Sequence, residues 1–490
     1  MRKHFIISIT TLFSLALALP LGAQRPQSSQ ARKAVYISFA DAQQVVATLA
    51  QILPDELKGK SEAEIAVAWP AWVARHDAEI RARLAQGDED SLVNFLLFGT
   101  SFTKQPRVTL SQLQSMKDAA GPSPGVGTNA QLDPTSRLIG ARITDLVRAS
   151  VAPGANDRLL FARKILNEKG FRPETKEGRE RAEEYLGASL QRVIKENTGY
   201  ARALEAARLQ GDASDEFAER SRLFRTRGLA SDTSLLPNYA IEESLKEIKV
   251  RGLLTPASVR RVAIIGPGLD FTDKQEGYDF YSLQTIQPFA VIDTLLRLGL
   301  ANPDSLKVVT FDLSPRVNDH LAQARQRAER GQGYVIQLPR DELAQWKAGA
   351  TTFWERFGNQ VGNAVAPAAV PPTAAKTKIR AVRIRPAIVL RVAPVDTNIV
   401  LQRLDLPPPE KFDLILATNI LVYYDNFDQS LALMNVQRML RPGGLMLSNN
   451  ALLELPFFRI RSAGYSTIVY SERADDGDHI VWYRRLPDDQ

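Results

Sequence analysis

The sequence R-V-A-I-I-G-P-G-L-D, residues 261–270, decides the fold that we expect for this chain. Residues 262–266 are a short, apolar, β-branched run, typical of a buried strand, and Gly-Pro-Gly breaks that strand into a tight turn. Gly266 and Gly268 have no side chain, so a ligand can contact the main chain there, and glycine tolerates the positive φ that such turns often need. An ordinary turn after a buried strand is the alternative for this stretch taken alone.

Further strand-like runs follow the glycine turn and alternate with turns and a helix. The second run ends in Asp312, and an acid at the carboxyl end of the strand after a glycine turn can accept hydrogen bonds from both hydroxyls of a ribose. The alternation predicts an α/β fold, a Rossmann-like, doubly wound parallel sheet with its ligand at the carboxyl ends of the strands. The expected strands are 306–311, 398–404 closed by Asp405, 412–418 followed by Asn419, and 445–448, with a helix at 427–440 before the last of them.

The motifs of residues 253–490 resemble those of the class I S-adenosylmethionine-dependent methyltransferases. G-P-G-L-D resembles their glycine loop, T-F-D-L (310–313) their ribose-binding acid, and R-L-D-L (403–406) the acid beside the adenine. The stretch F-D-L-I-L-A-T-N-I-L-V-Y-Y-D, followed by L-R-P-G-G-L-M-L, is most similar to the enzymes that methylate glutamates of chemotaxis receptors. The terminal runs 465–470 and 479–484 predict an antiparallel hairpin, with which methyltransferase sheets end and nicotinamide-binding sheets generally do not.

The resemblance implies S-adenosylmethionine as the cofactor and assigns residues to it, without a catalytic base. The implied cofactor-binding residues are Gly266 and Gly268 for main-chain approach, Asp270 for the methionine amino group, Asp312 and Leu313 for the ribose, Asp405 and Leu406 for the adenine edge, and Asn419 beside the transferred methyl.

Two departures from the family pattern leave the methyl acceptor open. Asp270 stands where the family usually has a third glycine, and residues 271–281 are acidic and aromatic, which suits either a solvated loop or a lid that recognises substrate. Thr418 stands where the receptor-methylating enzymes have an arginine. The acceptor can therefore be a protein or a small molecule.

Residues 1–23 have the features of a signal peptide. Arg2-Lys3-His4 precedes an apolar run at 5–21, and small residues precede Gln24, where cleavage is expected. Retention as an N-terminal membrane anchor is the alternative, because the run approaches the roughly 20 residues that span a bilayer. In both cases we expect the rest of the chain outside the cytoplasm, in the periplasm or secreted.

Length and composition limit the remaining possibilities. At 490 residues, with 44% hydrophobic and 24% charged residues, the chain fits a two-domain globular protein. Its net charge of +7, or +5 without the two leader cations, gives no reason to expect nucleic acid as a partner. The absence of cysteine excludes disulfides and thiolate chemistry, and four histidines do not favour a metal cluster.

Residues 24–250 predict an α-helical domain whose function the sequence does not assign. Periodicity places helices at 41–53, 61–84 and 86–103, a Gly/Pro-rich loop at 120–130, and four more helices between 138 and 209. The acids 88–90 are interpreted as helix-start carboxylates that favour the macrodipole, with a metal site as the alternative.

Residues 251–490 are expected to form the methyltransferase-like domain, with a Pro/Ala-rich insertion near 359–378. The insertion predicts a mobile or extended loop. The basic run K-I-R-A-V-R-I-R that begins at its end predicts an added strand, either an edge strand protected by charge or a surface for an acidic substrate.

The sequence thus predicts an exported S-adenosylmethionine-dependent methyltransferase of unknown acceptor. Because S-adenosylmethionine is made and used in the cytoplasm, the alternative is a non-catalytic exported protein. Such a protein would use a degenerate methyltransferase fold as a nucleoside-binding or protein-interaction scaffold. Nicotinamide-dependent reduction is disfavoured by the terminal hairpin and by the glycine loop without its third glycine.

Overall fold

A computed structural model describes residues 33–109, 112–113, 133–210, 224, 227–272, 278–449, 451–473 and 476–487. The expected signal peptide and the loop at 120–130 lie outside these described residues. Residues 34–490 form a single unit by their contacts. Of the helices in the described ranges, none is both long and apolar enough to cross a bilayer.

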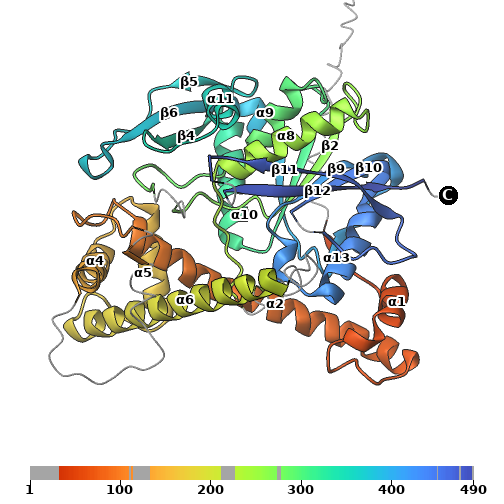
Figure 1. The fold of residues 1–490 in the computed structure, drawn as a ribbon, viewed down its shortest axis with the longest axis horizontal. Coiled ribbons are helices and arrows are strands. Elements are labelled where there is room, and N and C mark those ends of the chain that lie inside the picture. Colours follow the sequence, from red (N-terminus) through yellow and green to blue (C-terminus); the bar gives the residue numbers. More distant parts are fainter. Residues whose placement is uncertain are drawn as a thin grey trace, which may run out of the picture. The chain divides into compact units, whose positions relative to one another are not determined.

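A seven-stranded sheet at the centre has the strand order β11-β12-β10-β9-β2-β3-β7 (Figure 1). Neighbouring strands from β10 to β7 pair parallel, whereas β12 pairs antiparallel with both β10 and β11. The predicted α/β, Rossmann-like sheet is therefore confirmed. The strands are β2 (Arg261–Ile265), β3 (Lys307–Asp312), β7 (Val392–Asp396), β9 (Phe412–Ala417), β10 (Leu440–Ser448), β11 (Ile460–Val469) and β12 (Gly477–Arg485).

The third strand of the sheet differs from the predicted one. β7 pairs with β3, whereas the residues expected there form β8 (Gln402–Leu404), which pairs antiparallel with β1 (Ala34–Tyr36) in a separate two-stranded sheet. Pro394 lies within β7, and proline is a signal against a central strand. It is tolerated because β7 is the last strand at its edge of the sheet.

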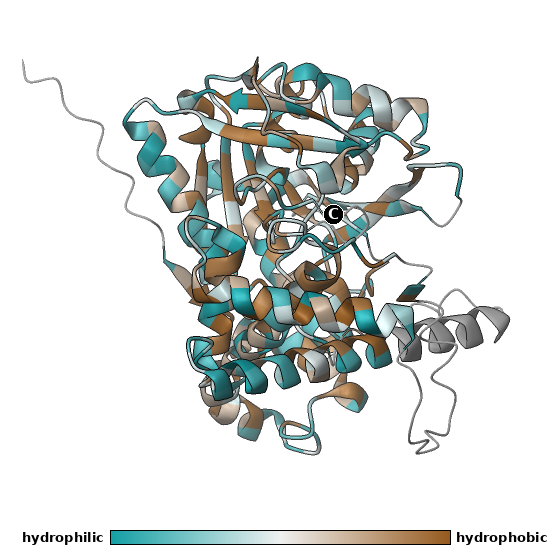
Figure 2. Cartoon of the chain, turned by 90° about the vertical axis from the view of Figure 1, so that its left-hand side faces the viewer, coloured by the Kyte–Doolittle hydropathy of each residue, from teal (hydrophilic) through white to brown (hydrophobic). Residues whose placement is uncertain are grey.

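Helices cover both faces of the sheet, and the strands alternate between two hydrophobic clusters. Val262 and Ile264 pack in the cluster with α8 (Leu236–Val250), α9 (Gln287–Arg297) and α10 (Pro315–Glu329). Ala263 and Ile265 pack in the other cluster, with α1 (Phe39–Thr48), α2 (Glu62–Phe98) and α13 (Asn426–Met439). Hydrophobic residues follow the central strands, while the helices carry hydrophilic residues on their outer faces (Figure 2). A strand buried on both faces needs such a continuous apolar run.

The N-terminal helices contribute to the core under the sheet as well as to a cluster of their own. α2 is one helix, where the sequence predicted two, and it continues through Gly87, at which a Cβ would lie 2.0 Å from the carbonyl oxygen of Leu229. The carboxylates expected at a helix start are therefore in mid-helix, and they pair with distant cations: Asp90 with Arg192 at 2.6 Å and Asp88 with Arg316 at 3.3 Å. A separate helical domain ending at residue 250 stays a prediction.

The described residues also form five further helices and four 3₁₀ turns. They are α4 (Pro134–Val151), α5 (Asp157–Glu168), α6 (Lys176–Gln210), α11 (Ala348–Arg356), α12 (Pro386–Val389) and the 3₁₀ turns η1 (Ala50–Ile52), η2 (Pro372–Ala374), η3 (Pro408–Glu410) and η4 (Leu421–Tyr423).

The insertion after α10 forms a small antiparallel sheet in the order β4-β6-β5. It consists of β4 (Tyr334–Asp341), β5 (Gly362–Val365) and β6 (Thr377–Ile384). The expected mobile loop at 359–378 thus contains a strand, and the basic run lies in the central strand, not at an edge. The central strand accommodates the cation of Arg380 because the guanidinium donates to the carbonyl oxygens of Trp354 at 2.5 Å and Phe357 at 3.0 Å.

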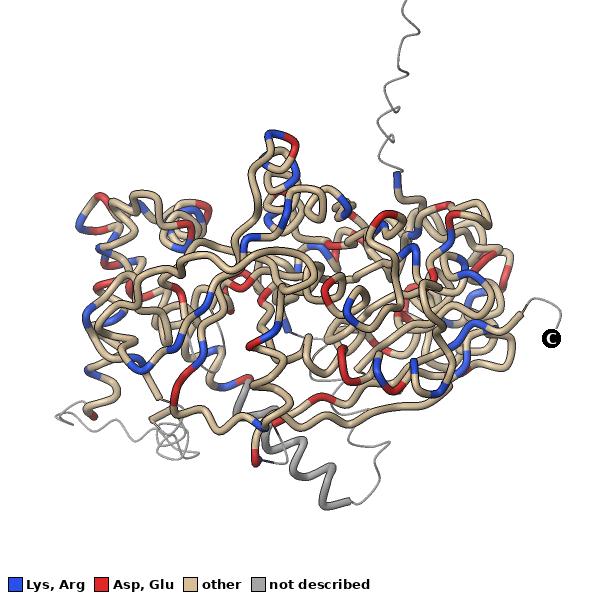
Figure 3. The backbone as a smooth tube through the Cα atoms, turned by 90° about the horizontal axis from the view of Figure 1, so that it is seen from above, with Lys and Arg blue, Asp and Glu red and all other residues tan. Residues whose placement is uncertain are grey.

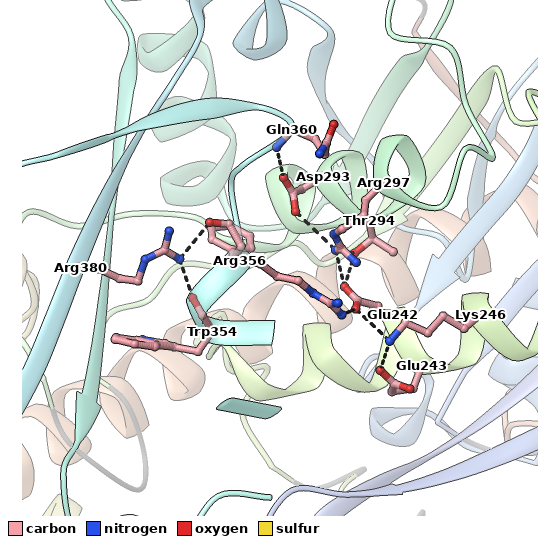
Figure 4. Close-up of polar contacts among 11 residues, drawn as sticks. Glu242, Glu243, Lys246, Asp293, Thr294, Arg297, Trp354, Arg356, Gln360 and Arg380 are labelled. Atoms are coloured by element: carbon pink, nitrogen blue, oxygen red, sulfur yellow. Dashed lines mark hydrogen bonds and ion pairs between the residues drawn. The ribbon is translucent and has the colours of Figure 1, made fainter. Parts of the chain in front are cut away.

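A buried ionic cluster connects this insertion to the helices of the main sheet (Figure 4). Glu242 of α8 is fully buried and is paired with Arg297 of α9, Arg356 of α11 and Lys246. Burial raises the pKa of Glu242, but the hydrogen bond and charge of Arg297 outweigh burial and lower the pKa below its ordinary value. Because every contact of Glu242 in the cluster is to a cation or hydroxyl of the scaffold, we interpret it as structural.

Candidate functional site

A cavity of about 720 Å³ lies at the carboxyl ends of β2, β3 and β9, where a parallel sheet binds its ligands. Six of the eight residues predicted to bind the cofactor line it, and two do not. Those that line it are Gly266, Gly268, Asp270, Asp312, Leu313 and Asn419.

The glycine turn forms a closely packed wall of the cavity. Gly266 and Gly268 have φ angles of 65° and 63°. A Cβ on Gly266 would lie 2.1 Å from the Cδ1 of Ile420, and one on Gly268 would lie 2.7 Å from the carbonyl oxygen of Ser231. The backbone angle therefore favours glycine at both positions, and at Gly268 the nearby main chain of Ser231 also leaves no room for a side chain.

Asp312 lies beside this turn at the carboxyl end of β3, with 8% of its surface exposed. Its carboxylate accepts hydrogen bonds from the main-chain amides of Ser314, at 2.8 Å, and Gly268. Burial raises the pKa of Asp312 to about 7, and these two hydrogen bonds oppose the increase. The structure thus joins the predicted glycine turn and the predicted ribose-binding acid.

Asp270 is buried in the same cavity, and neutral donors hold its carboxylate. The hydroxyl of Tyr281 and the amide of Gln284 both donate to Oδ2 at 2.8 Å. The Gln284 side chain also bonds the main chain of Gln337 in β4, so Asp270 is tied to the inserted sheet.

Asp405 and Leu406 do not line the cavity, so their assignment to the adenine stays a prediction from the motif. They follow β8, in the two-stranded sheet, because the third strand of the main sheet is β7. Thr397 and Ile399, just after β7, line the cavity in their place. That Thr397 and Ile399 line the cavity could not be obtained from the sequence once β7 was missed.

Two residues of the cavity lining have a buried hydroxyl without a hydrogen-bond partner. Within the described part of the chain, the Oγ1 atoms of Thr272 and Thr397 have no hydrogen bond, although these residues are only 1% and 2% exposed. A buried hydroxyl without a partner costs about 1 to 3 kcal/mol. Each of these oxygen atoms exposes less than 1 Å², so a ligand in the cavity could bond to it only after the lining shifts locally.

Asn419 begins a chain of hydrogen bonds along another wall. Its φ of 58° is unusual for a residue other than glycine, and such backbone conformations occur often at functional sites. The main-chain amide of Asn419 donates to Oδ1 of Asn449 at 2.9 Å, and Nδ2 of Asn449 donates to the carboxylate of Asp478 at 2.8 Å. The hydroxyl of Tyr470 donates to the other carboxylate oxygen of Asp478. The last three residues were not predicted, because the hairpin that carries two of them gives no motif.

Arg158 of α5 is a further residue that the sequence did not indicate. It is 1% exposed, and its guanidinium donates to the main-chain oxygens of Phe271, Asp279 (3.2 Å), Tyr281 (2.5 Å) and Asp270 (3.1 Å). Four of the loop residues around these carbonyls line the cavity: Asp270, Thr272, Tyr278 and Tyr281. An arginine on an amphipathic helix ordinarily faces solvent, so no local pattern could reveal this contact.

The segment after the N-terminal helices also contributes to the site. Residues 229–237 line one side of the cavity. No group of three or more potential metal ligands occurs among the described residues.

Comparisons with known proteins give structural neighbours but no sequence match. No protein family and no curated protein matches the chain. The N-methyltransferase NodS from Bradyrhizobium japonicum WM9 matches with a TM-score of 0.25 and 14% identity, over 50% of this chain and 98% of NodS. The glycopeptide N-methyltransferase MtfA matches with a TM-score of 0.24 and 11% identity, over 51% of this chain and 96% of MtfA.

A third match is the magnesium protoporphyrin IX methyltransferase ChlM from Synechocystis PCC 6803, which has S-adenosylmethionine bound. Its TM-score is 0.24 and its identity 11%, over 61% of this chain and 96% of ChlM. NodS with S-adenosylhomocysteine and MtfA with S-adenosylmethionine are also among the matches.

Proposed function

We propose that this chain is an S-adenosylmethionine-dependent methyltransferase. The observation that carries the proposal is the position of Asp312. Its carboxylate ends the strand next to the glycine turn, accepts a hydrogen bond from Gly268, and faces a cavity at the carboxyl ends of a parallel sheet. A nucleoside that enters such a cavity finds main chain at the glycines and an acceptor for its ribose hydroxyls.

The residues present fit the cofactor in two respects. The acid at β3 can bind the ribose, and the acidic surroundings suit a cation. Thr397 and Ile399 take the adenine side, in place of Asp405 and Leu406.

The cofactor supplies a methyl group on a sulfonium, which is already a strong electrophile. The protein residues therefore have to bind, orient and exclude water more than they have to activate. Asn419, fixed by Asn449 and packed next to Ile420 over the glycine turn, is placed to orient the acceptor.

Two finer parts of the proposal rest on the sequence. The leader pattern at 1–23 supports a function outside the cytoplasm, and the resemblance around Asn419 supports a relation to the receptor-methylating enzymes. That relation does not name the acceptor, because Thr418 replaces their arginine, and its Oγ1 accepts a hydrogen bond from Gln287 at 3.0 Å.

We expect the protein to bind S-adenosylmethionine and S-adenosylhomocysteine. The Gly268→Ala substitution should lower the affinity for each compound at least tenfold. The new Cβ would collide with the carbonyl of Ser231 and strain the backbone at positive φ, so the turn would have to move. Isothermal titration calorimetry measures both affinities, with circular dichroism to establish that each variant is folded.

Gly299→Ala is the matched control, because Gly299 has a φ of 68° but no atom within 4 Å of the position that a Cβ would take. It should lose about 1 kcal/mol of stability and keep the affinity. If the folded wild-type protein binds neither compound at millimolar concentration, the enzyme proposal is wrong and the non-catalytic scaffold is favoured.

A further inference from the structure

The described residues that line the cavity include acids but neither lysine nor arginine. The acids are Asp232, Asp270, Asp312, Asp476 and Asp478. Burial lowers the pKa of His479, the one histidine in this lining, so it adds no positive charge at pH 7. The whole chain nevertheless has a net charge of +7, and cations are interspersed with acids along it (Figure 3). The cavity is thus an acidic site in a basic protein.

The lining of the cavity has two parts that differ in their polar groups. Thr272 and Thr397 lie on the side of the glycine loop and of β7, where the cofactor is proposed to bind. The part formed by the terminal hairpin has polar groups of its own, among them those of Asp478 and Tyr470.

The hairpin wall of the cavity presents a fixed carboxylate. Asp478 accepts from Asn449 and from Tyr470, and Asn449 in turn accepts from the amide of Asn419. Burial, followed by the charge of Asp478, raises the pKa of Tyr470, so its hydroxyl stays protonated and remains a donor. Trp346 and Tyr423 also line the cavity. Aromatic faces attract cations, and the guanidinium of Arg340 already lies over the Trp346 ring, 5.0 Å from its centroid.

We propose that the methyl acceptor is an amine, which enters the cavity as an ammonium ion and is received at the wall of Asn419, Asn449, Asp478 and Tyr470. This inference rests on the proposed function and names its acceptor class. A carboxylate or phosphate acceptor would lie among carboxylates with no cation in the described lining to compensate it, and like charges in a partly buried site repel strongly.

The methyl transfer balances with groups already in this wall. The ammonium ion first gives one proton to the Asp478 carboxylate, which frees the nitrogen lone pair. That lone pair forms the new nitrogen–carbon bond while the methyl–sulfur bond breaks and its electron pair returns to sulfur. The product is a methylated ammonium ion, and the sulfonium becomes a neutral thioether.

Binding of matched probe pairs to the protein saturated with S-adenosylhomocysteine tests the acceptor class without relying on turnover. We use phenethylamine with 3-phenylpropionate and hexylamine with hexanoate, each pair having similar size and opposite charge. Calorimetry should show the amine of each pair binding at least about tenfold tighter than its carboxylate. Asp478→Asn should reduce that preference to less than about threefold, because it removes the nearest charge.

Asp304→Asn is the control, because the Asp304 side chain is 95% exposed and does not line the cavity. This variant should keep the wild-type preference for amines over carboxylates. If Asp478→Asn does not fold, Asp476→Asn replaces it, because Asp476 lines the same cavity. Carboxylates that bind as tightly as the amines, or amines that do not bind at all, would overturn the inference. Failure of S-adenosylhomocysteine to bind in the first titration would instead overturn the proposed function.

Discussion

Asp312→Asn is expected to weaken the binding of S-adenosylmethionine at least tenfold and, in the same variant, to stabilise the protein above pH 7. The affinity falls because the carboxylate would accept charge-assisted hydrogen bonds from the ribose, each contributing about 1.5 to 3 kcal/mol. The stability rises because burial disfavours the charged form of this carboxylate. Asparagine is neutral, so the variant avoids the cost of burying a charge.

The pH dependence of the wild-type protein follows from the same carboxylate. The native pKa of Asp312 is about 7, against an ordinary value of 3.8, so between these values the native state binds more protons than the unfolded state. The free energy of unfolding therefore falls as the pH rises through this window, by up to about 4 kcal/mol, and Asp312→Asn removes that part of the slope. Cofactor affinity has the opposite dependence and should be about tenfold weaker at pH 6 than at pH 8.

Urea unfolding from pH 4 to 8 measures the effect on stability, and calorimetry at pH 6, 7 and 8 measures the effect on affinity, with Asp405→Asn as the control. Asp405 is exposed and outside the cavity, so this variant should keep the wild-type affinity within about twofold. An Asp312→Asn protein that binds the cofactor as tightly as wild type would show that this carboxylate does not contact the ribose.

Arg158→Met is expected to lower the free energy of unfolding by at least about 3 kcal/mol and to weaken cofactor binding in the protein that remains folded. Methionine fills much of the space but leaves four main-chain oxygens without their donor, at about 1 to 3 kcal/mol for each group left unsatisfied. The loop that carries Asp270 and Tyr281 then loses its position at the cavity.

Arg142→Met separates the loss of stability from the loss of the site. Arg142 is equally buried and also donates to four main-chain oxygens, those of Leu96, Gly99, Gln105 and Pro106, and none of these residues lines the cavity. It should destabilise the protein by a similar amount and leave the affinity unchanged. Equal affinity losses in both variants would mean that Arg158 has no specific relation to the site.

The sequence was sufficient wherever the signal was local. β2 is a short apolar run, the turn after it contains two glycines at positive φ, and β3 ends in an acid. Each of these three features can be recognised without knowing the rest of the fold. Asn419 could be predicted for the same reason, since it directly follows the apolar run of β9.

The parts that could not be predicted depend on contacts between distant residues. Pro394 obscured β7, whose place at the edge makes proline acceptable, and residues 398–404 were predicted as the third strand instead. The acids in α2 looked like a helix start because their cations, Arg192 and Arg316, are more than a hundred residues away. Arg158 is separated from its loop by a similar distance, so only the folded chain shows that the helical region supports the site.

A crystal structure of the protein with S-adenosylhomocysteine tests the central claim most directly. The proposal predicts the ribose hydroxyls within hydrogen-bond distance of the Asp312 carboxylate, the main chain of Gly266 and Gly268 against the ligand, and the adenine beside Thr397 and Ile399. A nucleoside bound elsewhere on the protein, or a ribose turned away from Asp312, would contradict it.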